Sequence, residues 1–582
     1  MILQALCGYY ERLASSDNDS VAMPGWAVTP VSACITIDAN GNVVNVLSLI
    51  DEKKPKQLVT PQQPKRAGQR PNAAFLCENS NFLFGIYKDK KGADYRFEAS
   101  RVLHSEILGN VDDAGAHAVM GFFEKRVKGS CEYSGVDTAP LEMNGNIVFR
   151  LVNDADYIHN RPVVKAAWER YNTKSLENSE VMQCLVTGIV APIARLHGNL
   201  GGFGQDKPTI VGFNQPSFES YHKSQGANAP VSESAAFRYV TALNALIADS
   251  QHIVRMADTK VVFWAERDAL TEENFMYTLF GGKSDETVVR DEVSARKIGA
   301  LLSCVRNGKS PDMPGIDSNV TFHILGISAA KTRLVVRFFY SDTFGNLLDR
   351  IGQHYRDIEI DGADWDSKLT TPYIILIETA VAHKSDNITP TLEGALMRSI
   401  ITGLPYPHSL YNLILTRVRA DKNISHTRVG VIKGFLNRNA RFNDKQEMIT
   451  VALNTEEKNT GYLLGRLFAV LEKAQYDALG NVNATIVDKY LNSALATPQT
   501  VFPVLLPLFE KHVSKSEKYY SKQLVQRIVG EFTPLGFPQT LNAEDQGRFL
   551  IGYYHQRQDF YKGKPQEQKT EDENMNGGNE NE

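Results

Sequence analysis

The chain has 582 residues, a formal net charge of −4 at pH 7, 42% hydrophobic and 22% charged residues. These values are typical of a folded globular protein of about two to four domains and argue against a disordered or fibrous chain. No run of about 18 apolar residues predicts a membrane span, and the first residues lack the basic start of a signal peptide. The six cysteines are scattered without a CxxC pair. We therefore expect buried free thiols, a cytoplasmic location and no zinc site of clustered thiolates.

The N-terminal part predicts a mixture of strands and helices. A hairpin is expected between residues 26 and 51, where Asn40 and Gly41 separate two runs rich in β-branched residues. Further strands are predicted at 81–85, at 259–268 and in the first half of 332–358, and helices at 95–108 and in the second half of 332–358.

Beyond about Trp365 the hydrophobic period becomes helical, and one run places Leu463, Leu464, Leu467, Phe468 and Leu471 on one face. The predicted fold class is therefore α+β, with a mixed α/β N-terminal region followed by an all-α C-terminal helical bundle. The predicted divisions are a mixed region at 1–365, a helical connecting region at 366–447, a bundle at 448–562 and a disordered acidic tail at 563–582.

The motifs of common catalytic centres are absent from the sequence. It holds no HExxH and no GxSxG, and Gly282, Lys283 and Ser284 match only the end of a phosphate-binding loop. We therefore expect no catalytic centre, no metal site and no cofactor. A nuclease with a dispersed carboxylate site remains an alternative, because acids far apart in sequence can meet in a fold.

The segment from residue 65 to residue 85 carries cations followed by amides. Cations can neutralise phosphates, and amide side chains can hydrogen-bond base edges. Phe75 and Phe82 could stack on bases, but core positions are the favoured interpretation for both rings. For the cations, a solvated loop is an equally good interpretation. The candidate DNA-binding residues of this segment are Lys65, Arg66, Arg70, Asn72, Asn79 and Asn81.

Four lysines near the C-terminus follow one another at helical spacing. Lys511, Lys515, Lys518 and Lys522, here called the lysine stripe, are predicted to share one face of a helix. Because like charges repel, such a face favours a bound polyanion, which would release counterions and make binding depend steeply on salt. The alternative is a solvated helix face whose charge is compensated by acidic residues elsewhere in the fold.

Ordered stretches through nearly the whole chain resemble the large subunit of the type I-C CRISPR Cascade surveillance complex. They include "QRPNAAFLCENSNFLFG", "SFESYHKSQGANAPVSESAAFRYVTALNAL", "GALMRSIITGLPYPHSLYNLILTRVRAD" and "FLIGYYHQRQ". The resemblance implies a subunit without enzymatic activity that recognises the protospacer-adjacent motif in double-stranded DNA. It also implies that the subunit helps to unwind the duplex, stabilises the R-loop and presents a platform for a helicase-nuclease.

The implied partners are guide RNA, target double-stranded DNA, the backbone, foot and small subunits of Cascade, and the helicase-nuclease, with no membrane. The C-terminal bundle resembles the Cascade small subunit, and the resemblance implies that this subunit is also made from an internal start. Met448 is the candidate start, giving residues 448–582. A structural scaffold that never contacts DNA remains a further alternative.

One of the matching stretches predicts a polar loop that leads into a helix. We expect Lys223, Gln225 and Asn228 of this loop to face nucleic acid; a loop that satisfies its own backbone is the alternative. Ser232 is the predicted N-cap of the helix. The expected core anchors of that helix are Ala236, Tyr239, Val240 and Leu243.

Overall fold

The computed structural model describes residues 1–15, 22–52, 54–64, 71–86, 93–142, 145–176, 180–204, 207–213, 215–256, 258–280, 300–301, 303–305, 316–330, 333–362, 370–444, 448–532 and 536–561. The predicted DNA-binding cations Lys65, Arg66 and Arg70 lie outside these residues, as do the predicted tail at 563–582 and the Gly282 segment. The chain forms two compact units. The first unit comprises Met1–Asp249, Glu266–Asp268 and Ala329–Val335, and the second comprises Ser250–Ala265, Ala269–Ser328 and Val336–Glu582.

The first unit contains a six-stranded sheet organised around one long strand. Strand β1 (Trp26–Ile37) pairs antiparallel with β4 (Lys54–Pro61) through its first half and with β2 (Val43–Ser48) through its second half. It also pairs in parallel with β6 (Asn146–Leu151). The short strands β3 (Ile50–Asp51) and β5 (Cys77–Asn79) extend the two edges.

The predicted hairpin between β1 and β2 is confirmed, and its turn is held by one carboxylate. Asp38 accepts hydrogen bonds from the backbone N–H groups of Asn40 (2.9 Å) and Asn42 (2.8 Å). Gly41 has a φ of +81°, and a Cβ there would lie 2.2 Å from the backbone nitrogen of Phe122. The turn therefore needs glycine both for its conformation and for its close approach to helix α4 (Ala114–Lys125).

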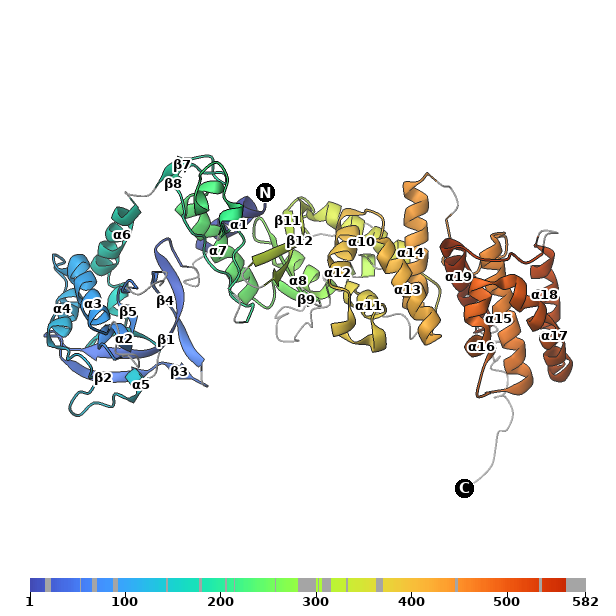
Figure 1. The fold of residues 1–582 in the computed structure, drawn as a ribbon, viewed down its shortest axis with the longest axis horizontal. Helices are drawn as coiled ribbons and strands as arrows, with labels where there is room; N and C mark the ends of the chain where they lie inside the picture. The colour runs from blue at the N-terminus through green and yellow to red at the C-terminus, as the bar shows by residue number, and fades with distance from the viewer. Residues whose placement is uncertain are drawn as a thin grey trace, which may run out of the picture. The chain divides into compact units, whose positions relative to one another are not determined.

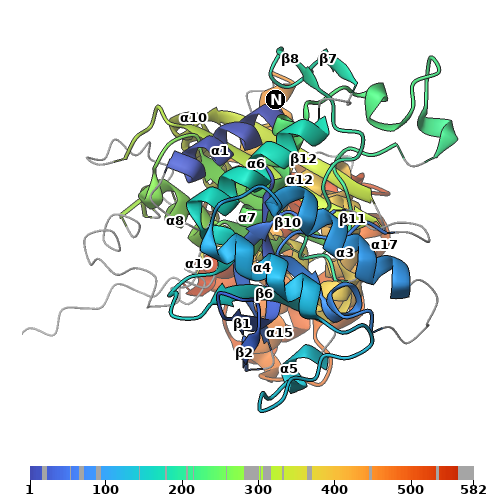
Figure 2. The same ribbon diagram turned by 90° about the vertical axis from the view of Figure 1, so that its left-hand side faces the viewer.

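Helices cover one face of the sheet, and the alternation along β1 shows why. Ala33, Ile35 and Ile37 point into a core that includes Phe122, whereas Cys34 belongs to a small cluster on the opposite face. Helix α4 contacts β1 and β6, as seen in Figure 2. The other helical segments of this part are α2 (Ser80–Leu83), α3 (Ala93–Leu108), α5 (Ala139–Glu142), η1 (Ile158–Asn160) and α6 (Pro162–Leu176).

The first unit also contains a helical pair formed by α1 (Ile2–Ser15) and α7 (Glu233–Ala248). The predicted N-cap is confirmed, because the Ser232 hydroxyl accepts a hydrogen bond from the backbone N–H of Ala235 at 3.2 Å. All four predicted anchors of α7 are buried. The smaller elements here are β7 (Val181–Gln183), β8 (Val190–Pro192), η2 (Pro216–Phe218) and η3 (Gln225–Asn228).

The second unit begins with a four-stranded sheet whose order is β12-β11-β10-β9. Helices enclose it with a continuous hydrophobic core that includes Phe263, Phe322, Phe344 and Leu396. The strands are β9 (Ile253–Met256), β10 (Thr259–Ala265), β11 (Thr321–Ala330) and β12 (Arg333–Thr343). The last residues of β11 and the first three of β12 lie within Ala329–Val335 and so belong to the first unit. The helical segments are α8 (Leu270–Leu279), α10 (Phe344–Ile358), α11 (Pro372–Ile377), η5 (Val381–His383), η6 (Ser385–Asn387), α12 (Pro390–Thr402), α13 (His408–Asp421) and α14 (His426–Phe442).

The second unit ends in the helical bundle drawn in orange and red in Figure 1, in which α15 and α19 pack closely. A Cβ on Gly465 of α15 would lie 1.9 Å from the carbonyl oxygen of Phe549, and one on Gly552 of α19 would lie 2.2 Å from that of Tyr462. Glycine on each helix thus brings the two backbones together. The bundle comprises α15 (Thr460–Leu479), α16 (Ile486–Ala496), α17 (Pro498–Ser516), α18 (Tyr520–Gly530) and α19 (Ala543–Tyr561).

The predicted α+β class is confirmed, with the sheets in the N-terminal half and helices in the C-terminal part. The predicted helical face of α15 is buried. The strand predicted at 81–85 is wrong: residues 80–83 form α2, because the Asn79 side chain accepts from the backbone N–H of Asn81 and starts a helical turn. The two compact units of the chain separate near residue 249. The domain boundaries expected from the sequence at residues 365 and 447 stay predictions.

In the described ranges, no helix has the length and apolar character needed to cross a bilayer.

Candidate nucleic-acid interface

The segment from Pro71 to Ser80 carries the predicted DNA-binding residues Asn72 and Asn79, and a buried carboxylate holds it in shape. Glu78 is fully buried, and its two oxygens accept hydrogen bonds from the backbone N–H groups of Ala74 and Asn79, each at 2.8 Å. A carboxylate that accepts backbone donors at both oxygens fixes the path of the chain on either side of it. Glu78 therefore sets the position of the exposed Asn72.

Replacing Glu78 by glutamine is expected to lower the free energy of unfolding by about 1–3 kcal/mol, because one of the two buried N–H groups would face an amide donor. Chemical denaturation of the full chain measures this difference. Glu132→Gln is the matched control, since Glu132 is exposed and only its backbone N–H takes part in a hydrogen bond among the described residues. Equal stability of the Glu78 variant and the control would contradict the bracing role.

A buried histidine supports the same segment from helix α3. His104 Nδ1 donates to the carbonyl oxygen of Ser100 at 2.7 Å, which leaves Nε2 to accept from the backbone N–H of Leu76 at 3.0 Å. Burial lowers the pKa of His104 to about 3, so the ring remains neutral and keeps both roles at physiological pH. Leu76 has a φ of +51°, an uncommon conformation for this residue. The histidine thus stabilises a bend that brings the chain into β5.

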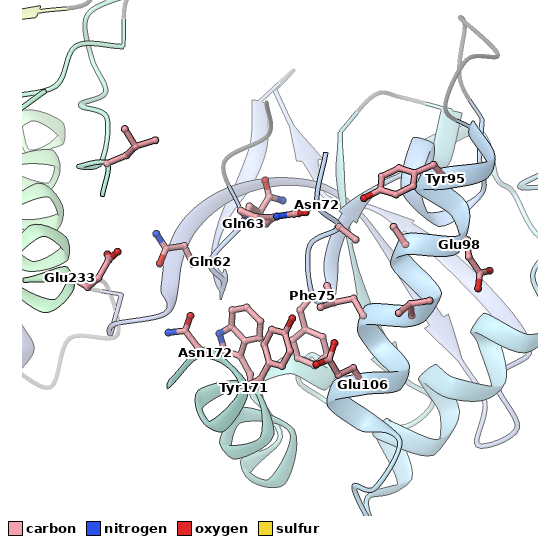
Figure 3. A pocket seen from close by; sticks show the side chains of 17 residues that line it. Gln62, Gln63, Asn72, Phe75, Tyr95, Glu98, Glu106, Tyr171, Asn172 and Glu233 are labelled. Carbon is pink, nitrogen blue, oxygen red and sulfur yellow. The ribbon is translucent and has the colours of Figure 1, made fainter. Parts of the chain in front are cut away.

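A hollow of about 740 Å³ lies beside Asn72, and we call it the amide pocket. Figure 3 shows the side chains of Gln62, Gln63 and Asn72 on one side of it and the rings of Phe75 and Tyr171 below them. Phe75 stacks on Trp168 with ring centroids 5.4 Å apart. The polar and aromatic residues that line the pocket are Gln62, Gln63, Asn72, Phe75, Tyr95, Glu98, Glu106, Trp168, Tyr171, Asn172 and Glu233.

The amide pocket brings together groups that can recognise a nucleobase. Primary amides both donate and accept hydrogen bonds, and so can match base edges, although the Gln63 amino group already donates to Cys77 and Asn146. The half-buried rings of Tyr95 and Tyr171 can stack on base faces, whereas Phe75 is buried against Trp168. Pro64 and Asn72 line the pocket and flank, in sequence, the segment that carries Lys65, Arg66 and Arg70. The described residues Pro64 and Asn72, one on each side of the basic segment in sequence, therefore both lie at the pocket.

The structure gives the predicted asparagines different positions. Asn72 is exposed at the amide pocket, whereas the Asn79 side chain caps α2 and Asn81 is half-buried in that helix. Phe75 and Phe82 are both buried, which confirms the core interpretation of the two rings. Only Asn72 of this set lies at a hollow suited to a base.

The polar loop before α7 satisfies much of its own backbone. Asn228 accepts from the backbone N–H of Ser220 at 2.9 Å and donates to the carbonyl oxygens of Lys223 (2.8 Å) and Gln225 (3.0 Å). The amide of Gln225 accepts from Arg195 at 2.7 Å, and Lys223 is exposed. Asn228 therefore has a structural role, as in the alternative interpretation. Contact of Lys223 and Gln225 with nucleic acid stays a prediction.

The prediction that the lysine stripe lies on one continuous helix is wrong. Helix α17 ends at Ser516, Glu517 has a φ of +56°, and α18 begins only at Tyr520. Lys518 lies between the helices and pairs with Asp477 at 2.9 Å, while Lys522 pairs with Glu510 at 2.9 Å. Lys511 and Lys515 are exposed on α17. Lys518 and Lys522 thus already have acidic partners, and DNA binding by these four lysines stays a prediction.

The candidate internal start, Met448, is exposed and is followed by a residue fixed to the preceding helix. Ile449 exchanges two backbone hydrogen bonds with the side chain of Asn437 on α14, at 2.8 and 3.0 Å. Translation from Met448 stays a prediction.

Sequence reasoning missed several residues of the amide pocket. Gln62 and Gln63 could have been noted, because only Pro64 separates them from the basic segment. Tyr95, Tyr171 and Asn172 come from α3 and α6, and no local pattern distinguishes them from ordinary helical residues. Only the folded chain brings them to Asn72.

Comparison with known protein families assigns the chain to one of them. A family model described as CRISPR-associated protein (Cas_Csd1) matches residues 6–561, so the protein is CRISPR-associated and belongs to this family. The match confirms the resemblance to the large subunit of the type I-C Cascade. No match is found among curated proteins.

Proposed function

We propose that this Cascade subunit recognises the protospacer-adjacent duplex through the amide pocket, while the guide RNA reads the rest of the target by base pairing. The observation that carries the proposal is the position of Asn72 at a hollow lined with amides and rings, at the end of a segment with three cations. Cations next to a polar pocket suit a ligand with a charged backbone and hydrogen-bonding edges. Nucleic acid has both features.

The acids of the amide pocket favour contact with bases over contact with phosphates. Glu98, Glu106 and Glu233 line it, and carboxylates repel the backbone of DNA while accepting hydrogen bonds from amino groups such as N4 of cytosine. Glu98 is bound to Arg101, which lowers its pKa and keeps it charged. We propose that the basic segment binds backbone phosphates outside the pocket and that the amides read base edges.

Replacing Asn72 by alanine is expected to reduce the discrimination among adjacent base pairs by about 1–3 kcal/mol, the typical contribution of a good base contact. The measurement is binding of the assembled complex to duplexes in which each adjacent base pair is varied in turn. Asn110→Ala is the control, because Asn110 is exposed in the same unit and does not line the pocket. A variant that binds all duplexes more weakly by one common factor would show that Asn72 does not read bases.

We further propose that the subunit is not an enzyme, that it helps to open the duplex and stabilise the R-loop, and that it presents the surface for a helicase-nuclease. The family supports a place in Cascade. Incubation of the purified chain with labelled DNA and Mg²⁺ separates this proposal from a nuclease. Cleavage that a single carboxylate substitution abolishes would favour the nuclease.

A further inference from the structure

A second hollow in the first unit has the opposite charge character from the amide pocket. It has a volume of about 390 Å³, and three of its lining residues are the exposed cations Arg195, Lys207 and Arg333. None of its described lining residues is a carboxylate. We call it the cationic pocket. Nothing in the sequence suggested it, since its three cations are spread over nearly 140 positions.

The position of Arg195 is fixed by the polar loop that precedes α7. Its guanidinium donates to the amide oxygen of Gln225 at 2.7 Å, and its carbonyl oxygen accepts from the N–H of Gly226 at 3.1 Å. A Cβ on Gly226 would lie 2.0 Å from the carbonyl oxygen of Ala194, so only glycine permits this approach. Gln225 itself has a φ of +45°. The loop thus holds an arginine at the cationic pocket, at the cost of an uncommon backbone conformation.

Arg333 is also fixed from two sides. Its backbone forms a parallel bridge with Thr209, another lining residue, and its guanidinium lies 4.1 Å from the centre of the Phe218 ring. A cation over an aromatic face is held without neutralisation of its charge. In the described part of the chain, neither Arg195, Lys207 nor Arg333 forms a salt bridge. Three like charges around one hollow repel each other, and a bound anion would remove that repulsion.

The rest of the lining of the cationic pocket is mixed: His197, Asn199 and Thr209 are polar, and several other residues form an apolar wall. Leu196, Ile210, Phe213 and Leu334 line it next to the three cations. The volume of about 390 Å³ falls within the range of roughly 300–1,000 Å³ typical of pockets that hold small ligands. A free inorganic anion would leave the apolar wall without a partner. A nucleotide unit offers both parts, a phosphate for the cations and a sugar or base for the apolar side chains.

We propose that the cationic pocket binds one phosphodiester group and the attached nucleoside of a single-stranded segment of nucleic acid. We assign the apolar wall to the base, and a base can turn toward it only in a single strand, because in a duplex the bases are stacked and paired. The proposal rests on the proposed function, since it assumes that the subunit works on nucleic acid. The phosphodiester chemistry is common to guide RNA and to a DNA strand released from the duplex, and the experiment separates the two.

The test compares Arg195→Gln/Lys207→Gln/Arg333→Gln with the charge-matched control Arg255→Gln/Lys489→Gln/Arg398→Gln, whose three residues are exposed in the second unit. Two salt dependences are measured, that of assembly of the subunit onto the guide-RNA-containing remainder of the complex and that of target binding by the assembled complex. Loss of one phosphate contact on a single strand is expected to reduce the slope of log K against log salt by about 0.7.

If the slope for assembly falls by about 0.7 while the control is unchanged, the ligand is guide RNA. If the slope for target binding falls by the same amount, the ligand is a DNA strand. Unchanged slopes in both arms would overturn the proposal. A fall of the slope by about 2 would also overturn the proposal, since it would indicate three separate phosphates on an open surface. Failure of the proposed function gives a different result: the unsubstituted complex would then bind duplexes with any adjacent base pairs equally well. Equal melting temperatures of the two triple variants establish that both are folded.

Discussion

Replacement of Asp357 by asparagine is expected to lower the free energy of unfolding of the second unit by about 3–5 kcal/mol. Asp357 is 2% exposed at the end of α10, and Arg438 of α14, which is fully buried, donates to it at 2.6 Å. Arg441 and Gln353 also donate to the same carboxylate. The variant would leave Arg438 as a buried charge without its counter-ion, which is among the most destabilising changes in a protein core.

The pH dependence of this effect has a definite sign. Burial alone would raise the pKa of Asp357, but hydrogen bonds from Arg441 and Arg438 and the charge of Arg438 hold it below its usual range. A lowered pKa in the folded state contributes stability above the unfolded-state pKa, and this contribution is lost as pH falls through the folded-state value. The difference between wild type and variant should therefore be full at pH 7 and shrink below about pH 4.

Urea denaturation of the full chain at several pH values, followed by a probe in the second unit, measures both effects. Asp444→Asn is the matched control, because Asp444 is exposed and forms no ion pair among the described residues. A variant whose deficit stays constant from pH 7 to pH 3 would contradict the assigned ion pair, since a purely steric defect does not titrate.

The second large effect is expected for Arg126→Met, which should destabilise the first unit by at least about 3 kcal/mol, since each hydrogen bond from a charged group contributes about 1.5–3 kcal/mol. Arg126 is 6% exposed and donates to the carbonyl oxygens of Phe82, Leu83 and Phe97 and to the Ser100 hydroxyl. Burial lowers its pKa to about 10, so it remains charged at neutral pH. Methionine can fill the space but donates no hydrogen bond, so all four are lost; the Ser100 hydroxyl then remains as a donor to the carbonyl oxygens of Phe82 and Phe97.

Because Arg126 joins the end of α2 to α3, its loss should also disturb the segment that presents Asn72. Binding of the assembled complex should therefore weaken for every duplex in parallel with thermal stability, unlike the selective effect expected for Asn72→Ala. Arg170→Met, an exposed position in the same unit, is the control. Full stability of the Arg126 variant in thermal denaturation would contradict the role assigned to its hydrogen bonds.

Local patterns in the sequence were sufficient where one interaction decides the structure. Asn40 and Gly41 predicted the hairpin, Ser232 predicted a helix start, and the period of apolar residues predicted the buried face of α15, all as observed. In each case a turn, a cap or a period acts over fewer than about ten residues, so distant residues have little influence on it.

The sequence-based predictions were wrong where a nearby residue that starts or ends a helix was overlooked. Residues 81–85 have the composition of a strand, but the Asn79 cap one residue before Ser80 starts a helical turn. The lysine spacing fits one helix, but the left-handed Glu517 ends α17 within the stripe. The amide pocket and the cationic pocket could not be predicted at all, because residues such as Asn172 and Arg333 reach them only through tertiary folding.

The glycine contact between α15 and α19 has a consequence for any shorter product of the same gene. Both helices follow Met448, so a polypeptide that begins there would contain Gly465, Gly552 and the backbone atoms they approach, and could close this crossing unaided. It would lose α13 and α14, however, and thereby uncover Gly547 of α19, which packs against Tyr411 and Ile432. A free short chain would thus expose the face of α19 that α13 and α14 contact in the full-length protein.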